Sequence, residues 1–165
     1  MPPLDLSISI ADVVIRLTVA MLIGMVLGIN RDLNDKPAGL RTHALVTIGS
    51  ALLTLVSISF ATMQGSVDSG TVGRVAQGIV TGIGFLGAGV ILQGDSPKSV
   101  RGLTTAASIW ITASLGIACG AGQWPAALIT LALTLFVLSA GGPIERAIYH
   151  RWRRQQTVSI DELEP

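Results

Sequence analysis

The chain has 165 residues, of which 50% are hydrophobic and only 13% are charged, and its formal net charge is +1. Soluble domains usually carry about 25% charged residues, so this composition excludes an ordinary water-soluble domain. No basic run is interleaved with aromatic residues, and we therefore expect no nucleic-acid partner. Cys119 is the single cysteine, which excludes an intrachain disulfide and a paired-cysteine metal site.

Five apolar stretches approach the roughly 20 residues that a helix needs to cross a bilayer core of about 30 Å. They cover residues 10–29, 44–63, 75–92, 103–121 and 124–140, and the loops between them are short. Backbone inside lipid must satisfy its own hydrogen bonds, which favours helices. The sequence therefore predicts an all-α integral membrane protein, with a bundle of about five transmembrane helices over residues 1–142 and a short basic tail over residues 143–165.

The positions of Lys and Arg predict how the spans are oriented. Arg74 lies at one end of the spans and Arg16 lies within the first one. The other nine gather at the opposite end if the amino terminus is outside: Arg31, Lys36, Arg41, Lys98, Arg101, Arg146, Arg151, Arg153 and Arg154. Because cytoplasmic loops carry an excess of Lys and Arg, the amino terminus is predicted outside and the carboxyl terminus in the cytoplasm.

A short internal repeat opens two of the spans. Residues 39–44 and 102–107 agree at four of six positions, and in each hexapeptide a threonine (Thr42 or Thr105) is placed to cap a new helix. Spans one and two would then be a parallel repeat of spans three and four. Six residues leave both duplication and chance open.

Glycines in the spans have two interpretations. Residues 82–87 match GxGxxG, but the nucleotide-binding motif needs a strand before it, and here it lies inside an apolar run. Small residues four apart instead let two helix backbones approach closely, either within the chain or in a dimer. We assign this packing role to Gly24, Gly28, Gly78, Gly82, Gly84, Gly87, Gly89, Gly116 and Gly120.

Polar residues form stripes at helical spacing in three spans. They are His43, Thr47, Ser50, Thr54 and Ser57 in the second, Arg74, Gln77 and Thr81 in the third, and Thr105, Ser108 and Thr112 in the fourth. Thr104, just before the last stripe, is a further polar candidate. One interpretation is hydrogen-bonded contact between helices, and the other is a polar-lined path.

Two charged residues lie inside the first span. Asp12 and Arg16 are four residues apart, a spacing that favours an ion pair on one helix face. An ionisable group at the depth of Arg16 indicates a functional site unless the side chain extends outward to the interface. We expect Arg16 to turn inward and meet Asp12, Gln77 or a hydroxyl of span two. If Arg74 faced the same cavity, the two charges would exclude cations and could hold an anion or the carboxylate of a partner.

No enzyme is expected, because the sequence shows no nucleophile–base pair and no metal-ligand cluster. Spans two to five contain no Asp or Glu, so a divalent-cation transporter is disfavoured and no cofactor is expected. Charges in the loops at the predicted cytoplasmic end are either solvated or form a docking or ion-sensing surface. The candidates there are Arg31, Asp32, Arg41 and Arg101.

Three blocks of sequence resemble the amino-terminal membrane domain of the MgtC/SapB family. They are KPAGLRTHALVTIGSAL (36–52), RVAQGIVTGIGFLGAGVIL (74–92) and RGLTTAASIWITASLGIACGAG (101–122). The family usually has Glu-Arg-Glu where this chain has Asn30-Arg31-Asp32. Many members also continue into a cytoplasmic α/β domain, which we do not expect here.

The resemblance implies a multi-pass protein of the bacterial inner membrane, linked to magnesium homeostasis and, in pathogens, to virulence and survival inside host cells. We therefore expect a non-enzymatic protein that lies in the lipid bilayer, forms a homo-oligomer with a dimer favoured, and modulates another membrane protein such as an ATPase. The alternative is a channel or transporter for a small ion, which uses the polar stripes of spans two to four.

Overall fold

The computed structural model describes residues 8–63, 69–92 and 101–161. Within these residues the fold is five α-helices and no strand: α1 (Ile10–Asp32), α2 (Leu40–Met63), α3 (Ser69–Leu92), α4 (Leu103–Gly120) and α5 (Trp124–Asp161). Each helix contains a stretch long and apolar enough to cross a membrane. The prediction of an all-α membrane protein with five spans is confirmed.

The helices extend beyond the apolar stretches that predicted them. α2 begins at Leu40 and α3 at Ser69, before the predicted starts at 44 and 75. Hydropathy marks only the part of a helix that matches the hydrocarbon core, so the polar turns that continue a span are missed. α5 continues through Pro143 to Asp161, and the segment expected to be a tail is helical over this range. Lys98 lies outside the described residues.

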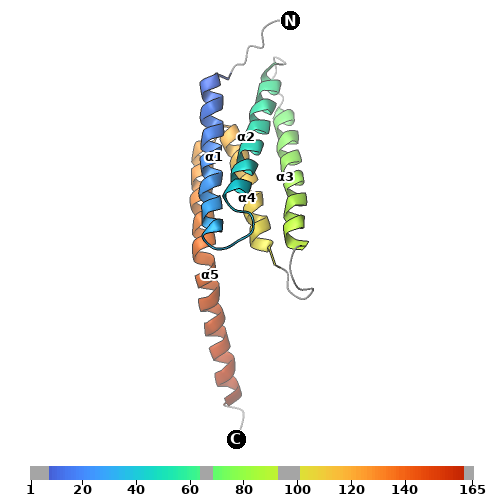
Figure 1. Cartoon of the computed structure of the whole chain (residues 1–165). Coiled ribbons are helices and arrows are strands. Elements are labelled where there is room, and N and C mark those ends of the chain that lie inside the picture. The colour runs from blue at the N-terminus through green and yellow to red at the C-terminus, as the bar shows by residue number, and fades with distance from the viewer. Residues whose placement is uncertain (1–7, 64–68, 93–100, 162–165) are drawn as a thin grey trace. The chain divides into compact units, whose positions relative to one another are not determined.

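The chain divides into two compact units, Met1–Leu131 and Ala132–Pro165. In the first unit α2 packs against α1, α3 and α4, and α4 also packs against α1 and α3. Figure 1 shows α2 between α1 and α3. In the second unit the described chain is the continuation of α5, whose side chains Leu133, Phe136 and Val137 are exposed.

Polar side chains are buried in the first unit while large apolar ones are exposed. Phe85 is 82% exposed and Leu45 is 70% exposed, whereas a set of hydroxyl side chains is buried. Lipid tails are as apolar as leucine, so large apolar side chains gain nothing by turning inward, and small or polar residues occupy the helix contacts. The buried hydroxyl residues are Thr47, Ser50, Thr54, Ser57, Thr105, Ser108 and Thr112, and Cys119 beside them is fully buried.

An apolar contact joins α3 to α4. Ile79 and Ile83 from α3 are buried against Ile109 and Ala113 from α4. This contact determines which face of α3 turns inward. The opposite face of α3, including its polar stripe, is exposed.

Candidate functional site

Arg16 links the start of α1 to the end of α4. Its Nη2 atom lies 2.9 Å from Asp12 Oδ2, and its Nη1 atom donates to the Gly120 carbonyl oxygen at 2.8 Å. Carbonyl groups of the last helical turn lack intrahelical donors and carry the negative end of the helix dipole, so a guanidinium there is stabilised. Gly122 has φ +72°, and a Cβ at this residue would lie 3.1 Å from Arg16 Nη1. The expected contact between Arg16 and Asp12 is present.

The structure does not place Arg16 and Arg74 in one cavity. Arg74 is exposed and its Nη2 atom donates to Thr71 Oγ1 at 3.0 Å, on its own helix. Gln77 is also exposed and does not reach Arg16. The apolar face of α3 packs inward, which turns its polar stripe away from α1 and α4.

Arg31 is buried in the last turn of α1. Its side chain is only 3% exposed, and Nη2 donates to Thr105 Oγ1 of α4 at 3.0 Å. The Nε atom of Arg31 is buried and has no hydrogen-bond partner. Asp32, the next residue, accepts from the Leu40 backbone N–H at 3.0 Å and so caps α2. The two charges of this stretch therefore have different roles.

His43 is fully buried between α2 and α4. Its Nδ1 atom lies 3.0 Å from the Gly39 carbonyl oxygen, and its Nε2 atom lies 3.3 Å from Ser108 Oγ. A carbonyl only accepts, so Nδ1 carries a hydrogen. Ser108 Oγ also lies 2.8 Å from the Thr105 carbonyl oxygen, and its single hydrogen serves either that oxygen or a neutral Nε2. The protonation state of His43 is thereby coupled to the orientation of one hydroxyl.

The hydroxyl stripes of α2 and α4 form a closed contact. Thr54 Oγ1 donates to the Ser50 carbonyl oxygen at 2.8 Å, and Thr112 Oγ1 donates to the Ser108 carbonyl oxygen at 2.7 Å, each within its own helix. A Cβ at Gly116 would lie 2.5 Å from the Thr47 carbonyl oxygen. The two backbones are therefore too close for a path between them at this level.

The prediction that Thr42 and Thr105 cap α2 and α4 is wrong. α2 begins at Leu40 and is capped by the Asp32 carboxylate, so Thr42 lies within the first turn. α4 begins at Leu103 after Gly102, which has φ +88° and gives no side-chain cap. A Cβ at Gly102 would lie 2.7 Å from the Val90 carbonyl oxygen, so the close approach of α3 favours glycine here.

The remaining charged and polar candidates are at the same end of the bundle but outside the buried cluster. Arg41, Arg101 and Thr104 are exposed, and Thr42 is half-buried. None of them contacts Arg31 or His43 through a hydrogen bond that the structure shows. Among the described residues, no three His, Cys, Asp or Glu side chains could together hold a metal ion.

The glycines assigned to packing fall into two groups. A Cβ at Gly24 would lie 2.6 Å from the His43 carbonyl oxygen, and one at Gly120 would lie 2.5 Å from that of Ala51. Gly28 and Gly116 approach the backbone of α2 in the same way, and Gly87 meets Ala106 of α4 at 3.5 Å. Four others have nothing of this chain within 4 Å of an added Cβ: Gly78, Gly82, Gly84 and Gly89. For these four glycines, a role in packing stays a prediction, and it would be packing against another molecule.

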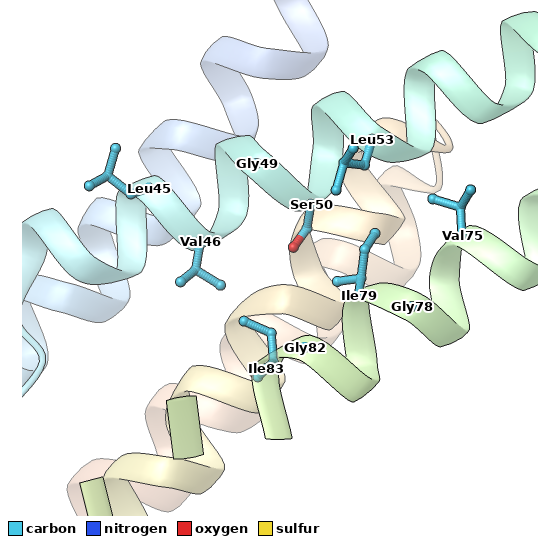
Figure 2. Close-up of a pocket in the computed structure, with 10 residues that line it drawn as sticks. All are labelled: Leu45, Val46, Gly49, Ser50, Leu53, Val75, Gly78, Ile79, Gly82 and Ile83. Atoms are coloured by element: carbon cyan, nitrogen blue, oxygen red, sulfur yellow. The ribbon is translucent and has the colours of Figure 1, made fainter. Parts of the chain in front are cut away.

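An open groove runs between α2 and α3. Its volume is about 510 Å³, and Figure 2 shows Val46 of α2 and Ile79 and Ile83 of α3 at its walls. Gly49, which was not predicted as a packing residue, lines it together with Gly78 and Gly82. The sequence signal for Gly49 was absent because it has no small partner four residues away.

Five helices long and apolar enough to cross a membrane define a multi-pass membrane protein. The model of the MgtC family matches residues 17–147, and the chain belongs to that family. The chain is 44% identical to Protein SrpB of Synechococcus elongatus over 91% of this chain and 87% of the relative. It is 46% identical to Protein MgtC of Salmonella typhimurium over 77% of this chain and 50% of the relative. For Protein SapB of Bacillus subtilis the identity is 42%, over 77% of this chain and 54% of the relative.

The chain thus spans about half the length of the MgtC and SapB relatives and most of the SrpB relative. No solved structure matches it. The resemblance found in the three sequence blocks is confirmed at the level of the family.

Proposed function

We propose that this protein is a non-enzymatic component of the bacterial inner membrane that modulates another membrane protein, such as an ATPase, through helix–helix contact. The observation that carries this proposal is the groove between α2 and α3, where Gly49, Gly78 and Gly82 leave about 510 Å³ of space. A transmembrane helix with small residues of its own would approach α2 and α3 closely there. The link to low-magnesium adaptation and to survival inside host cells is proposed from the family resemblance.

The closed contact between α2 and α4 favours modulation over transport. Its hydroxyl groups already bond to their own helices, as Thr54 and Thr112 do. Side chains that line an ion path must instead replace the water around the ion. At Gly116 and Gly120 the backbones of α2 and α4 are so close that an added Cβ would lie 2.5 Å from a carbonyl oxygen of α2.

A second small-residue surface supports the proposed homodimer. Gly84 lies about 120° around α3 from Gly78, given 3.6 residues per turn. It too has nothing of this chain within 4 Å of an added Cβ. In this proposal the groove face of α3 contacts a partner protein, and the face with Gly84 contacts a second copy of the chain.

Leucine in the groove is the direct test. We expect Gly82→Leu to abolish support of low-magnesium growth in a bacterial strain without its own family member, because the side chain fills the groove. Its thermal unfolding in detergent should match that of the wild type, since no atom of this chain lies within 4 Å of that Cβ. Gly73→Leu is the matched control, because Gly73 is equally open but does not line the groove.

Full growth support by a Gly82→Leu protein would overturn the role of the groove. Flux measurements in proteoliposomes test the transport alternative with Mg²⁺, K⁺, H⁺ and phosphate in turn. Saturable flux that Arg16→Leu abolishes would replace modulation by transport.

A further inference from the structure

Arg31 is a buried cation without a counter-charge in the part of the chain that the structure describes. Its side chain is 97% buried, and Thr105 Oγ1 is the acceptor for one of its five N–H donors. The Nε donor is buried without an acceptor. A guanidinium does not release its proton in proteins, so burial cannot neutralise it. Such a group requires an anion.

The other acceptors shown at the end of α1 bond to backbone N–H groups. The Ile29 carbonyl oxygen accepts from Leu33, and the Arg31 carbonyl oxygen accepts from Asn34 and Lys36. The Asp32 carboxylate accepts from the backbone N–H of Leu40. The acceptor that the structure shows for the guanidinium is therefore the hydroxyl of Thr105 in α4.

The guanidinium also lies against the positive end of a helix. Thr105 is in the first turn of α4, an 18-residue helix whose N-cap residue, Gly102, supplies no side-chain acceptor. First-turn N–H groups have no intrahelical partner and carry the positive end of the helix dipole. The dipole repels a cation at that point, and an anion beside the two groups would be attracted by both.

We propose that Arg31, the Thr105 hydroxyl and the first-turn N–H groups of α4 bind a phosphate group. Thr105 accepts from Arg31 through its oxygen, which leaves its hydrogen for a phosphate oxygen. Thr104, the preceding residue, is exposed and gives the route to the surface over the first turn of α4. The phosphate comes from a lipid headgroup or from free inorganic phosphate, and basic pockets between membrane helices bind headgroups in this way.

Binding is tested on the full-length purified protein with two probes. The first is inorganic phosphate added to protein in an uncharged detergent, with chloride at equal ionic strength as the reference. The second is a nanodisc of phosphatidylglycerol compared with one of phosphatidylcholine, both without free phosphate. We expect one probe to raise the midpoint of thermal unfolding, and the probe that does so identifies the source of the phosphate.

Two variants at the site and one outside it test whether the phosphate binds at Arg31 and Thr105. Arg31→Gln and Thr105→Val should each weaken the effective probe by about tenfold or more, because each removes a charge-assisted or hydroxyl hydrogen bond to the phosphate. Arg41→Gln, an exposed arginine at the same end, should change it by less than about twofold. If Arg31→Gln does not fold, Thr105→Val still decides, since valine keeps the shape of threonine. Stabilisation that is absent for both probes, or that survives Thr105→Val unchanged, overturns the proposal.

Discussion

Arg16 and Arg31 lie on the same helix, but their surroundings differ. Arg16 has a carboxylate at 2.9 Å and a helix-terminal carbonyl oxygen at 2.8 Å, so its charge is compensated by this chain. Arg31 has a hydroxyl at 3.0 Å and no carboxylate among the described residues. The first arrangement stabilises a helix end, and the second leaves binding capacity unused.

Arg16→Leu should lower the free energy of unfolding by about 1–2 kcal/mol, because it removes one ion pair and the donor to Gly120. Arg16→Lys should recover about half of that loss, since an ammonium lacks the fork that reaches both acceptors. Thermal unfolding in detergent measures both changes. Arg74→Lys is the control, because Arg74 is an exposed arginine whose Nη2 atom bonds to Thr71 of the same helix.

Lysine at position 16 also separates a structural from a functional role. A low-magnesium growth assay that gives wild-type growth for Arg16→Lys would remove Arg16 from the functional residues. Impaired growth with nearly normal expression would support a site that needs the guanidinium itself.

The contact between α2 and α4 depends on glycines more than on polar side chains. Gly116 and Gly120 bring α4 so close to α2 that an added Cβ would lie 2.5 Å from a backbone oxygen in each case. The hydroxyls that fill the rest of the contact are small and bond to their own helices. In a bilayer, this close van der Waals contact replaces the hydrophobic effect as the source of helix association.

Gly116→Ala should destabilise the protein by about 1–3 kcal/mol, because the backbones of α2 and α4 must move apart. Gly49→Ala should be neutral or slightly stabilising, since its Cβ meets nothing within 4 Å and alanine favours helix. Unfolding midpoints in the same detergent compare the pair. Equal midpoints for the two variants would mean that the α2–α4 contact adapts freely to an added methyl group.

Spacing in the sequence predicted which residues share a helix face, but did not predict which face turns inward. The stripes of α2 and α4 meet, but their threonine hydroxyls Thr54 and Thr112 bond back to their own helices, and the bond shown between the two stripes is that of His43 with Ser108. The stripe of α3 has the same spacing, and yet Arg74, Gln77 and Thr81 are exposed. Lipid gives no net drive to bury apolar faces, so packing of Ile79 and Ile83 against α4 determined the rotation of α3.

Long-range partners were also beyond the reach of spacing. The ion pair of Asp12 and Arg16 lies within one turn and was predicted from a separation of four residues. The partners of Arg31 and His43 are in α4, 74 and 65 residues away. Such contacts depend on the relative rotation of two helices, which a single sequence does not specify.

At the scale of the whole molecule, the buried charge of Arg31 and the capping charge of Asp32 lie at the end where α1 and α3 stop and α2 and α4 begin. Arg16 and the end of α4 lie at the opposite end. The orientation of the bundle in the membrane therefore decides which compartment supplies a ligand to Arg31. The Lys and Arg positions in the sequence predict an outside amino terminus, which would place this end in the cytoplasm.

Reporter fusions test this orientation. Fusions at Pro37 and Asp161 should both report a cytoplasmic position, because four helices lie between these residues. A fusion at Ser69 should report the outside, because only α2 lies between Pro37 and Ser69. A fusion at Asp161 that reports the outside would contradict the predicted orientation.

Burial of Cys119 has a practical consequence for spectroscopy. The sole thiol of the chain is fully buried, so a water-soluble maleimide has no access to it while the fold is intact. The natural sequence therefore serves as its own unreactive background for site-specific labelling. Single cysteines introduced at Gly49 and Gly82 would take spin labels on the two walls of the groove, and their separation would report whether it opens or closes in a native membrane.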